Sequence, residues 1–237
     1  WIAVFWLALA GLCVPAAASQ GAPVVAAASD LQFALEEVVT AFRRDTGRDV
    51  RLAFGSSGNF ARQIEQGAPF QMFLSADEQF VFGLADKGLT RDRGELYAIG
   101  RIVLYAPQGS TLAGRLSADG LRAALSEGAL KCLAIANPEH APYGRAARQW
   151  LEAQGLWESV VPKLVFGENA SQAAQFAASG NCDGGIIPYS LALASRIGSS
   201  GKAALLSAEG HQPLRQRMVL VKAASPDAER FYQYMQG

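Results

Sequence analysis

The segment PVVAAASDLQFALEEVVTAFRRDTGRDVRLAFGSSG, residues 23–58, contains the pattern that decides the fold. It begins with a short apolar run, PVVAAA (23–28), which predicts a buried strand. Apolar residues then recur every three or four positions until Gly47, which predicts an amphipathic helix that ends at this glycine. VRLAF (50–54) predicts a second strand. A strand, a helix and another strand in succession favour an α/β fold with parallel strands.

The same alternation continues along the rest of the chain. The further predicted strands are MFLS (72–75), CLAIA (132–136), KLVFG (163–167), GGIIP (184–188) and RQRMVLVKA (215–223). The further predicted helices cover 59–66, 78–88, 117–126, 144–154, 170–179 and 227–235. Strands that alternate with helices indicate a mainly parallel sheet covered by helices on both faces.

One longer run, YAIGRIVLYA (97–106), separates two sets of alternating elements. A run of this length is able to cross from one lobe to another. We therefore predict two α/β lobes joined by two crossings, near 101–106 and near 213–217. The predicted lobe I comprises 23–101 and 217–237, and the predicted lobe II comprises 102–216.

The composition excludes several classes of protein. The 237 residues include 21 Lys+Arg and 21 Asp+Glu, so the formal net charge is zero. Without a basic excess the chain cannot neutralise a nucleic-acid backbone, and we expect no nucleic-acid partner. Hydrophobic residues make up 50% of the chain, which indicates a globular protein with a large core and excludes a disordered one.

Residues 1–18, WIAVFWLALAGLCVPAAA, carry no charge and end in Pro15 and three alanines. An apolar run closed by small residues is typical of a secretory signal peptide. The run lacks the basic start and the Met of such a signal, so we interpret it as an N-terminally incomplete signal peptide. A membrane anchor is the alternative, since the run is just long enough to span a bilayer. A lipid-modified start at Cys13 is a second alternative.

Export affects the interpretation of the cysteines. Once the signal is removed, Cys132 and Cys182 remain as a pair in an oxidising compartment, which permits a disulfide. Each lies at the start of a predicted strand, so a bridge requires that these two strands be neighbours. Two separate buried thiols are the alternative.

Polar or glycine-rich turns follow four of the predicted strands, and each turn opens a predicted helix. In parallel sheets, ligands bind at the carboxyl ends of strands, where helix N-termini present free N–H groups. Together the turns supply hydroxyl and N–H donors that suit a small anion held without counter-charges. Helix capping is the alternative for each serine or asparagine taken singly. The turns are Ser29-Asp30, Gly55-Ser56-Ser57-Gly58, Asn137 to Gly144 and Glu168-Asn169-Ala170-Ser171.

The signatures of catalysis are weak. FGSSGN (54–59) does not match the G-x-S-x-G elbow of hydrolases, and the chain has two histidines to serve as a base. H-E-x-x-H, C-x-x-C, Walker and G-x-G-x-x-G motifs are absent from the sequence, so zinc, redox and nucleotide chemistry lack their usual signals. We expect a protein that is not an enzyme. An exported serine hydrolase that uses Ser57 and His140 is the alternative.

The same turns resemble those of the molybdate-binding family of periplasmic solute-binding proteins, the capture components of ABC importers. The resemblance covers nearly all of the chain from about Val24 onward. The matching segments are AAASDL (26–31), FGSSGNFARQIEQGAP (54–69), FLSADE (73–78), IANPEHAPYGRAA (135–147) and GENASQAAQFAASG (167–180). The resemblance implies a two-lobed periplasmic binding protein fold of type II. It also implies a monomer in the periplasm, molybdate as the transported ligand without any cofactor, and an importer permease with its ATPase as partners.

The resemblance further implies which residues hold the ion. Ser29 and Ser57 are expected to donate both their hydroxyls and their N–H groups. Tyr143 is expected to contribute mainly its N–H, and Ala170 its N–H at the start of a helix. All four reach the metal only through the molybdate oxygens.

Two further residues of this expected set are less typical. Asp30 stands where some relatives carry Asn, and a carboxylate facing a dianion would repel it. We therefore expect Asp30 to present its N–H and to turn its side chain away or cap the helix. A fifth ligand is expected at Tyr189, although Pro188, which has no N–H, occupies the place of the tyrosine in some relatives.

The ligand chemistry agrees with this set of donors. Molybdate and tungstate are fully deprotonated dianions near neutral pH, so neutral donors at helix N-termini suit both. Phosphate often carries a proton and favours a site with an added acceptor. Sulfate is proton-free and smaller, so molybdate over sulfate rests on the resemblance. An organic acid is a further alternative that requires an arginine, but we expect the nearest one, Arg145, to be a solvated helix position.

Overall fold

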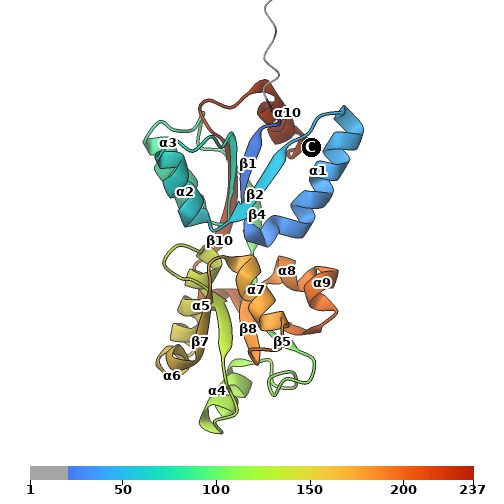
Figure 1. The fold of residues 1–237 in the computed structure, drawn as a ribbon. Helices are drawn as coiled ribbons and strands as arrows, with labels where there is room; N and C mark the ends of the chain where they lie inside the picture. Colours follow the sequence, from blue (N-terminus) through green and yellow to red (C-terminus); the bar gives the residue numbers. More distant parts are fainter. Residues whose placement is uncertain (1–20) are drawn as a thin grey trace, which may run out of the picture.

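The computed structural model describes residues 21–237 as two lobes, each built on one five-stranded sheet (Figure 1). The segment 1–18, interpreted above as a signal peptide, lies outside the described residues. Within the part of the chain that is described, no helix is long and apolar enough to cross a membrane. The predicted α/β class and two-lobed architecture are confirmed.

The first sheet has the strand order β2-β1-β3-β10-β4. β1 (Val24–Ala28) pairs in parallel with β2 (Arg51–Gly55) and β3 (Met72–Ser75). β10 (Leu214–Leu220) lies antiparallel between β3 and β4 (Glu95–Gly100). Figure 1 shows α1 on one face of this sheet and α2 and α3 on the other. The helices of this lobe are η1 (Ser29–Leu31), α1 (Gln32–Thr46), α2 (Ser57–Glu65), α3 (Glu78–Asp86) and α10 (Pro226–Tyr234).

The second sheet has the order β7-β6-β8-β5-β9, which repeats the plan of the first. β6 (Leu133–Ala136) pairs in parallel with β7 (Leu164–Gly167) and β8 (Gly184–Pro188). β5 (Ile102–Pro107) lies antiparallel between β8 and β9 (Gly201–Leu205). In each sheet one strand runs against the others, so both sheets are mainly parallel. The helices of this lobe are α4 (Ala118–Ser126), α5 (Pro142–Ala153), α6 (Trp157–Val160), η2 (Val161–Lys163), α7 (Ala170–Ala178), α8 (Tyr189–Leu193), α9 (Ser195–Gly198) and η3 (Ala208–Gly210).

The core of the first lobe explains why α1 forms where the sequence predicts a helix. Leu35, Val39 and Phe42 recur at helical spacing and are all buried. They pack in one apolar cluster with the strand residue Val25 and with Phe231 of α10. The helix ends at Gly47, whose positive φ of 67° is the left-handed conformation that glycine adopts most easily.

The chain crosses between the lobes twice. The first crossing is at Arg101, between β4 and β5. The second lies between Leu205, where β9 ends, and Leu214, where β10 begins. Leu214 is already paired with Gly100 of β4. The lobe boundary predicted between 216 and 217 therefore falls inside a strand, all of which belongs to the first sheet.

A disulfide joins two strands of the second lobe at their amino ends. Cys132 precedes β6 and Cys182 precedes β8, and these strands are parallel neighbours. Their Cα atoms are 4.9 Å apart and their sulfur atoms are bonded. The structure therefore supports the bridge rather than two separate thiols.

Candidate functional site

A small cavity lies where the carboxyl ends of strands from both lobes meet. Its wall includes Ser29, Asp30 and Ser57 from the first lobe and Tyr143 and Ala170 from the second. Five of the six residues predicted for the site therefore lie on one small cavity. The other residues of the wall are Ala28, Gly55, Ser56, Ala76, Ala141 and Pro142. No Lys, Arg or His side chain belongs to this wall.

Three helices begin at the cavity and direct N–H groups toward it. α2 begins at Ser57, α5 at Pro142 and α7 at Ala170. The N–H groups of a first helical turn have no acceptor inside their own helix. Among residues 21–237, the N–H groups of Ser57, Tyr143 and Ala170 have no protein acceptor. Each helix also carries a partial positive charge at its N-terminus, so the cavity suits an anion.

The hydroxyls of Ser29 and Ser57 are oriented by the protein itself. The Ser57 Oγ accepts a hydrogen bond from the N–H of Ala76 at 3.0 Å. The Ser29 Oγ accepts one from the N–H of Ser171 at 3.1 Å. A hydroxyl that accepts one bond keeps its own hydrogen for donation. Neither serine caps its helix, so the capping alternative does not account for them.

The side chain of Asp30 does not cap the helix, which was one of its two expected roles. It is buried, and its Oδ2 accepts from the Tyr143 hydroxyl at 3.0 Å and from Gln216 Nε2 at 2.8 Å. Burial raises the pKa of Asp30 to about 6, although these two hydrogen bonds oppose the rise. Burial and the Asp30 charge also raise the pKa of Tyr143 well above 10.0. The Tyr143 hydroxyl therefore serves Asp30, which agrees with a ligand role through its N–H.

Tyr189 does not lie on the cavity. Its side chain is 39% exposed, and its N–H donates to the carbonyl of Arg101 at 2.9 Å. That bond extends the pairing of β8 with β5, in which Pro188 lies opposite Ile102. The backbone at Tyr189 is thus used by the sheet, and the structure does not support Tyr189 as a ligand.

Contacts between the lobes close the cleft around the cavity. The N–H of Gly58 donates to the carbonyl of His140 at 3.0 Å, and Asn59 Nδ2 donates to Glu168 Oε1 at 2.6 Å. A Cβ atom at Gly58 would lie 2.7 Å from the His140 carbonyl oxygen, so a side chain there would separate the lobes. The His140 ring contacts the Oγ of Ser56 at 3.0 Å rather than that of Ser57. The hydrolase alternative thus lacks its predicted pair of Ser57 and His140.

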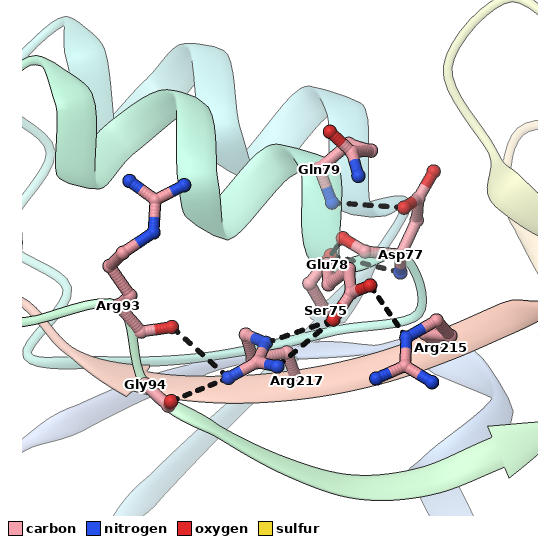
Figure 2. Close-up of polar contacts among 8 residues, drawn as sticks. All are labelled: Ser75, Asp77, Glu78, Gln79, Arg93, Gly94, Arg215 and Arg217. Carbon is pink, nitrogen blue, oxygen red and sulfur yellow. Dashed lines mark hydrogen bonds and ion pairs between the residues drawn. The ribbon is translucent and has the colours of Figure 1, made fainter.

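At the rim of the cleft, acidic side chains are paired with arginines. The rim comprises Asp77, Glu78, Arg145, Arg215 and Arg217. Glu78 accepts from Arg215 Nε at 2.6 Å and from Arg217 Nη2 at 3.0 Å (Figure 2). Burial would raise the pKa of Glu78, but the hydrogen bonds from the two arginines outweigh it and lower the pKa below 4.5. Beside Glu78, Asp77 forms an ion pair with Arg145 across the cleft. The expectation that Arg145 is merely a solvated helix position is wrong.

The described residues contain no group of three or more His, Cys, Asp and Glu side chains able to hold a bare metal ion. Among the described residues, the wall of the cavity supplies hydroxyl and N–H donors, and Asp30 is its one carboxylate. Such a site selects an anion through its oxygen atoms.

Comparison with known proteins agrees with this geometry. A family model of bacterial extracellular solute-binding proteins matches residues 23–237. The chain belongs to this family. The family binds solutes and is not a family of enzymes, and membership places the protein outside the cytoplasm.

Relatives of this solute-binding protein are similar over most of their length. The molybdate-binding protein ModA of Rhodobacter capsulatus is 36% identical over 219 residues, which are 92% of this chain and 82% of the relative. ModA of Azotobacter vinelandii is 35% identical over 226 residues, with 94% and 87% covered. The solved periplasmic molybdate-binding protein of Azotobacter vinelandii has a TM-score of 0.81 at 29% identity, with 91% of this chain and 93% of that chain covered.

A more distant solved structure shares the fold alone. The sulfate-binding protein SubI of Mycobacterium tuberculosis has a TM-score of 0.70 at 14% identity, with 91% of this chain and 81% of that chain covered. The two-lobed fold is therefore shared with a protein that is named for a different oxyanion. The fold alone does not identify a ligand.

Proposed function

We propose that this protein binds molybdate, or tungstate, in the periplasm and delivers it to the permease and ATPase of an ABC importer. One observation supports this proposal above the others: three helix N-termini and two serine hydroxyls converge on a single cavity whose wall contains no cation. The names of the relatives supply the identity of the ion. The protein acts as a monomer and performs no catalysis, and the segment 1–18 directs its export.

The donors satisfy a tetrahedral dianion because each ligand oxygen requires only hydrogen-bond donors. Ser29 and Ser57 donate their hydroxyl hydrogens, while Ser57, Tyr143 and Ala170 donate N–H groups that have no protein acceptor in the part of the chain described. Hydrogen bonds to a charged acceptor are about twice as strong as neutral ones. The closed cleft also excludes water, which strengthens these interactions. The ion is therefore held by dipoles from both lobes, so binding and closure favour one another.

Calorimetric titration of the exported protein, without residues 1–18, tests the proposal directly. We expect molybdate and tungstate to bind tightly and with similar affinity. Sulfate should bind at least about 100-fold more weakly, because the shorter ion cannot reach donors on both lobes at once. Phosphate should bind weakly because its proton would face a wall of donors. Sulfate binding as tight as that of molybdate would contradict the specificity, and no heat with any of the four ions would contradict the proposal itself.

A separate reagent tests the hydrolase alternative. A serine-directed fluorophosphonate should leave the protein unlabelled, because the Ser57 hydroxyl contacts a backbone N–H and not an imidazole. Stoichiometric labelling of Ser57 would instead favour catalysis. The two experiments therefore separate the two classes of function.

A further inference from the structure

The cluster of Asp30, Tyr143 and Gln216 leaves one carboxylate oxygen without a donor. Oδ2 of Asp30 receives the hydrogen of the Tyr143 hydroxyl and one hydrogen of the Gln216 amide. The other amide hydrogen of Gln216 goes to the Tyr143 oxygen at 2.7 Å. A phenol has one hydrogen and an amide nitrogen has two, so the donors of the cluster are fully used. Oδ1 of Asp30 is buried and receives no hydrogen bond from any other residue within 21–237, although the N–H of Asp30 itself acts on its carboxyl group and lowers the pKa.

No cation compensates this carboxylate among the residues that the structure describes. The strand β10 carries Arg215 and Arg217 beside the cluster, but both pair with Glu78. The helix α5 carries Arg145, which pairs with Asp77. An ionised Asp30 is therefore a buried charge next to a cavity that is built for a dianion.

The other titratable groups near Asp30 are neutral at physiological pH. Burial raises the pKa of Tyr143 on α5 and of Tyr97 on β4 well above 10.0, and the charge of Asp30 adds to the rise. The elements α7 and α8 bring only serines to this place, and Ser190 donates to the backbone carbonyl of Asp30 at 3.0 Å. The ring of His140 contacts the hydroxyl of Ser56 instead of Asp30. None of these groups offsets the charge of the carboxylate.

Closure of the lobes creates this environment. Asp30 and Gln216 belong to the first lobe, whereas Tyr143 belongs to the second. When the lobes separate, water reaches the carboxyl group and its ordinary pKa of 3.8 applies. In the closed form, burial raises that pKa to about 6. The closed form thus has the higher affinity for a proton.

We propose that Asp30 takes up a proton when the lobes close on the oxyanion, so that a neutral carboxyl with its hydrogen on Oδ1 lies beside the dianion. This inference rests on the function proposed above. An ionised Asp30 repels the dianion, whereas the neutral group does not. At pH values between the open-state and closed-state pKa values, each ion is therefore captured together with up to one proton, and Asp30 sets the pH range over which capture is tight.

The direction of the pH dependence follows from the raised pKa. Because the closed form binds the proton more tightly, the contribution of Asp30 to binding of the dianion is largest below about pH 6 and is lost as the pH rises through about 6. A bound dianion shifts the closed-state pKa further upward and extends this range toward neutral pH. We expect the Kd for molybdate to rise about tenfold or more between pH 5 and pH 7, with net proton uptake on binding.

Calorimetry with molybdate at pH 5, 6 and 7, in two buffers of different ionisation enthalpy, measures both the Kd and the protons taken up. Asp30→Asn removes the titration but keeps an oxygen that accepts from Tyr143. We expect this variant to bind with the same Kd at pH 5 and pH 7 and without proton uptake. Asp119→Asn is the matched control, since Asp119 is a 95% exposed carboxylate on α4 and does not belong to the cavity wall. It should keep the parental pH dependence.

The outcomes separate this inference from the proposed function. A parental Kd that is constant between pH 5 and pH 7, with no proton uptake, overturns the inference whether or not Asp30→Asn folds. A pH dependence that survives in folded Asp30→Asn overturns it as well. Failure of the parent to bind molybdate at any of these pH values contradicts the proposed function instead.

Discussion

The pKa of an acidic side chain is shifted in opposite directions in the interior of the cleft and at its rim. In the interior, Asp30 has no cationic partner among the described residues, and burial raises its pKa to about 6. At the rim, burial acts on Glu78 in the same direction, but Arg215 and Arg217 outweigh it and its pKa is lowered (Figure 2). Both acids lie in the same lobe. The partners of an acid, rather than burial alone, therefore decide its charge state here.

The difference shows how an anion site can be surrounded by arginines without using them. Arg145, Arg215 and Arg217 are all engaged by carboxylates of the first lobe. The cavity is left with N–H and O–H dipoles, which act only at short range and in a fixed geometry. The rim acts through charges, which salt screens. Variants of the two regions should therefore differ in the size of their effect and in their response to salt.

The largest effect is expected from removal of an interior N–H by Ala170→Pro. Ala170 is the first residue of α7, where proline is tolerated, and Asn169 before it is extended at φ −148° and ψ 176°. The helix should persist while the N–H is replaced by a ring carbon that faces the ion. We expect the Kd for molybdate to rise about 100-fold, which corresponds to about 3 kcal/mol.

Ala170→Gly is the matched control because it removes the side chain and keeps the N–H. Its Kd should stay within about threefold of the parental value. Circular dichroism of both variants checks that α7 remains folded. Equal losses in the proline and glycine variants would exclude the Ala170 N–H from the site.

A smaller interior effect is expected from Ser57→Ala, which removes one hydroxyl and keeps every N–H. The loss of a charge-assisted hydrogen bond should weaken molybdate binding by about 1.5–3 kcal/mol, at least about tenfold, as measured by calorimetry. Ser56→Ala is the control, because the Ser56 hydroxyl contacts His140 instead. It should change the Kd less than Ser57→Ala does. An unchanged affinity in Ser57→Ala would remove its hydroxyl from the site.

The interior was predictable from the sequence because its donors are local features. A turn that follows a strand and opens a helix places free N–H groups at the strand end, and this argument located the turns that contain Ser57, Tyr143 and Ala170. The family resemblance then selected these three residues within the turns. Gln216 was not predicted, because its contact with Asp30 joins residues 186 positions apart. Gln216 stands between Arg215 and Arg217, so no local signal in the sequence distinguishes it.

The rim was less predictable because its contacts are long-range side-chain pairs. Arg145 looked like a solvated helix position, yet it meets Asp77 from 68 positions away across the cleft. β9 was also missed, since GKAAL (201–205) is an edge strand whose Leu205 is 50% exposed and whose apolar pattern is weak. Such pairings depend on how two lobes pack, which periodicity along one segment does not encode.

At the rim, Glu78→Gln should affect stability more than binding. Glu78 has a lowered pKa, so its ion pairs stabilise the folded protein above its ordinary pKa of 4.5 and lose this effect as the pH falls through the lowered value. We expect a loss of about 1 kcal/mol at neutral pH, which lowers the Tm by about 2–4 °C. Thermal unfolding followed at a series of pH values from 7 down to below 4.5 measures this difference, which should shrink as the pH falls through the lowered pKa. A Tm difference that does not change with pH would contradict the ionic origin.

The smallest effect is expected from Asp77→Asn, which breaks the ion pair between the lobes. The amide keeps an oxygen that caps α3, so the helix should be unaffected. Arg145 is 39% exposed, and such pairs contribute about 0.2–1 kcal/mol, so molybdate binding should weaken no more than about fivefold at low salt.

In about 0.5 M NaCl, calorimetry should show no difference between Asp77→Asn and the parent, whereas the loss in Ala170→Pro should persist. Arg145→Gln should match Asp77→Asn, and the double variant should lose no more than either single one, because both remove the same interaction. A loss of affinity in Asp77→Asn that is independent of salt would contradict the ionic origin of its effect. The rim would then not differ from the interior in its response to salt.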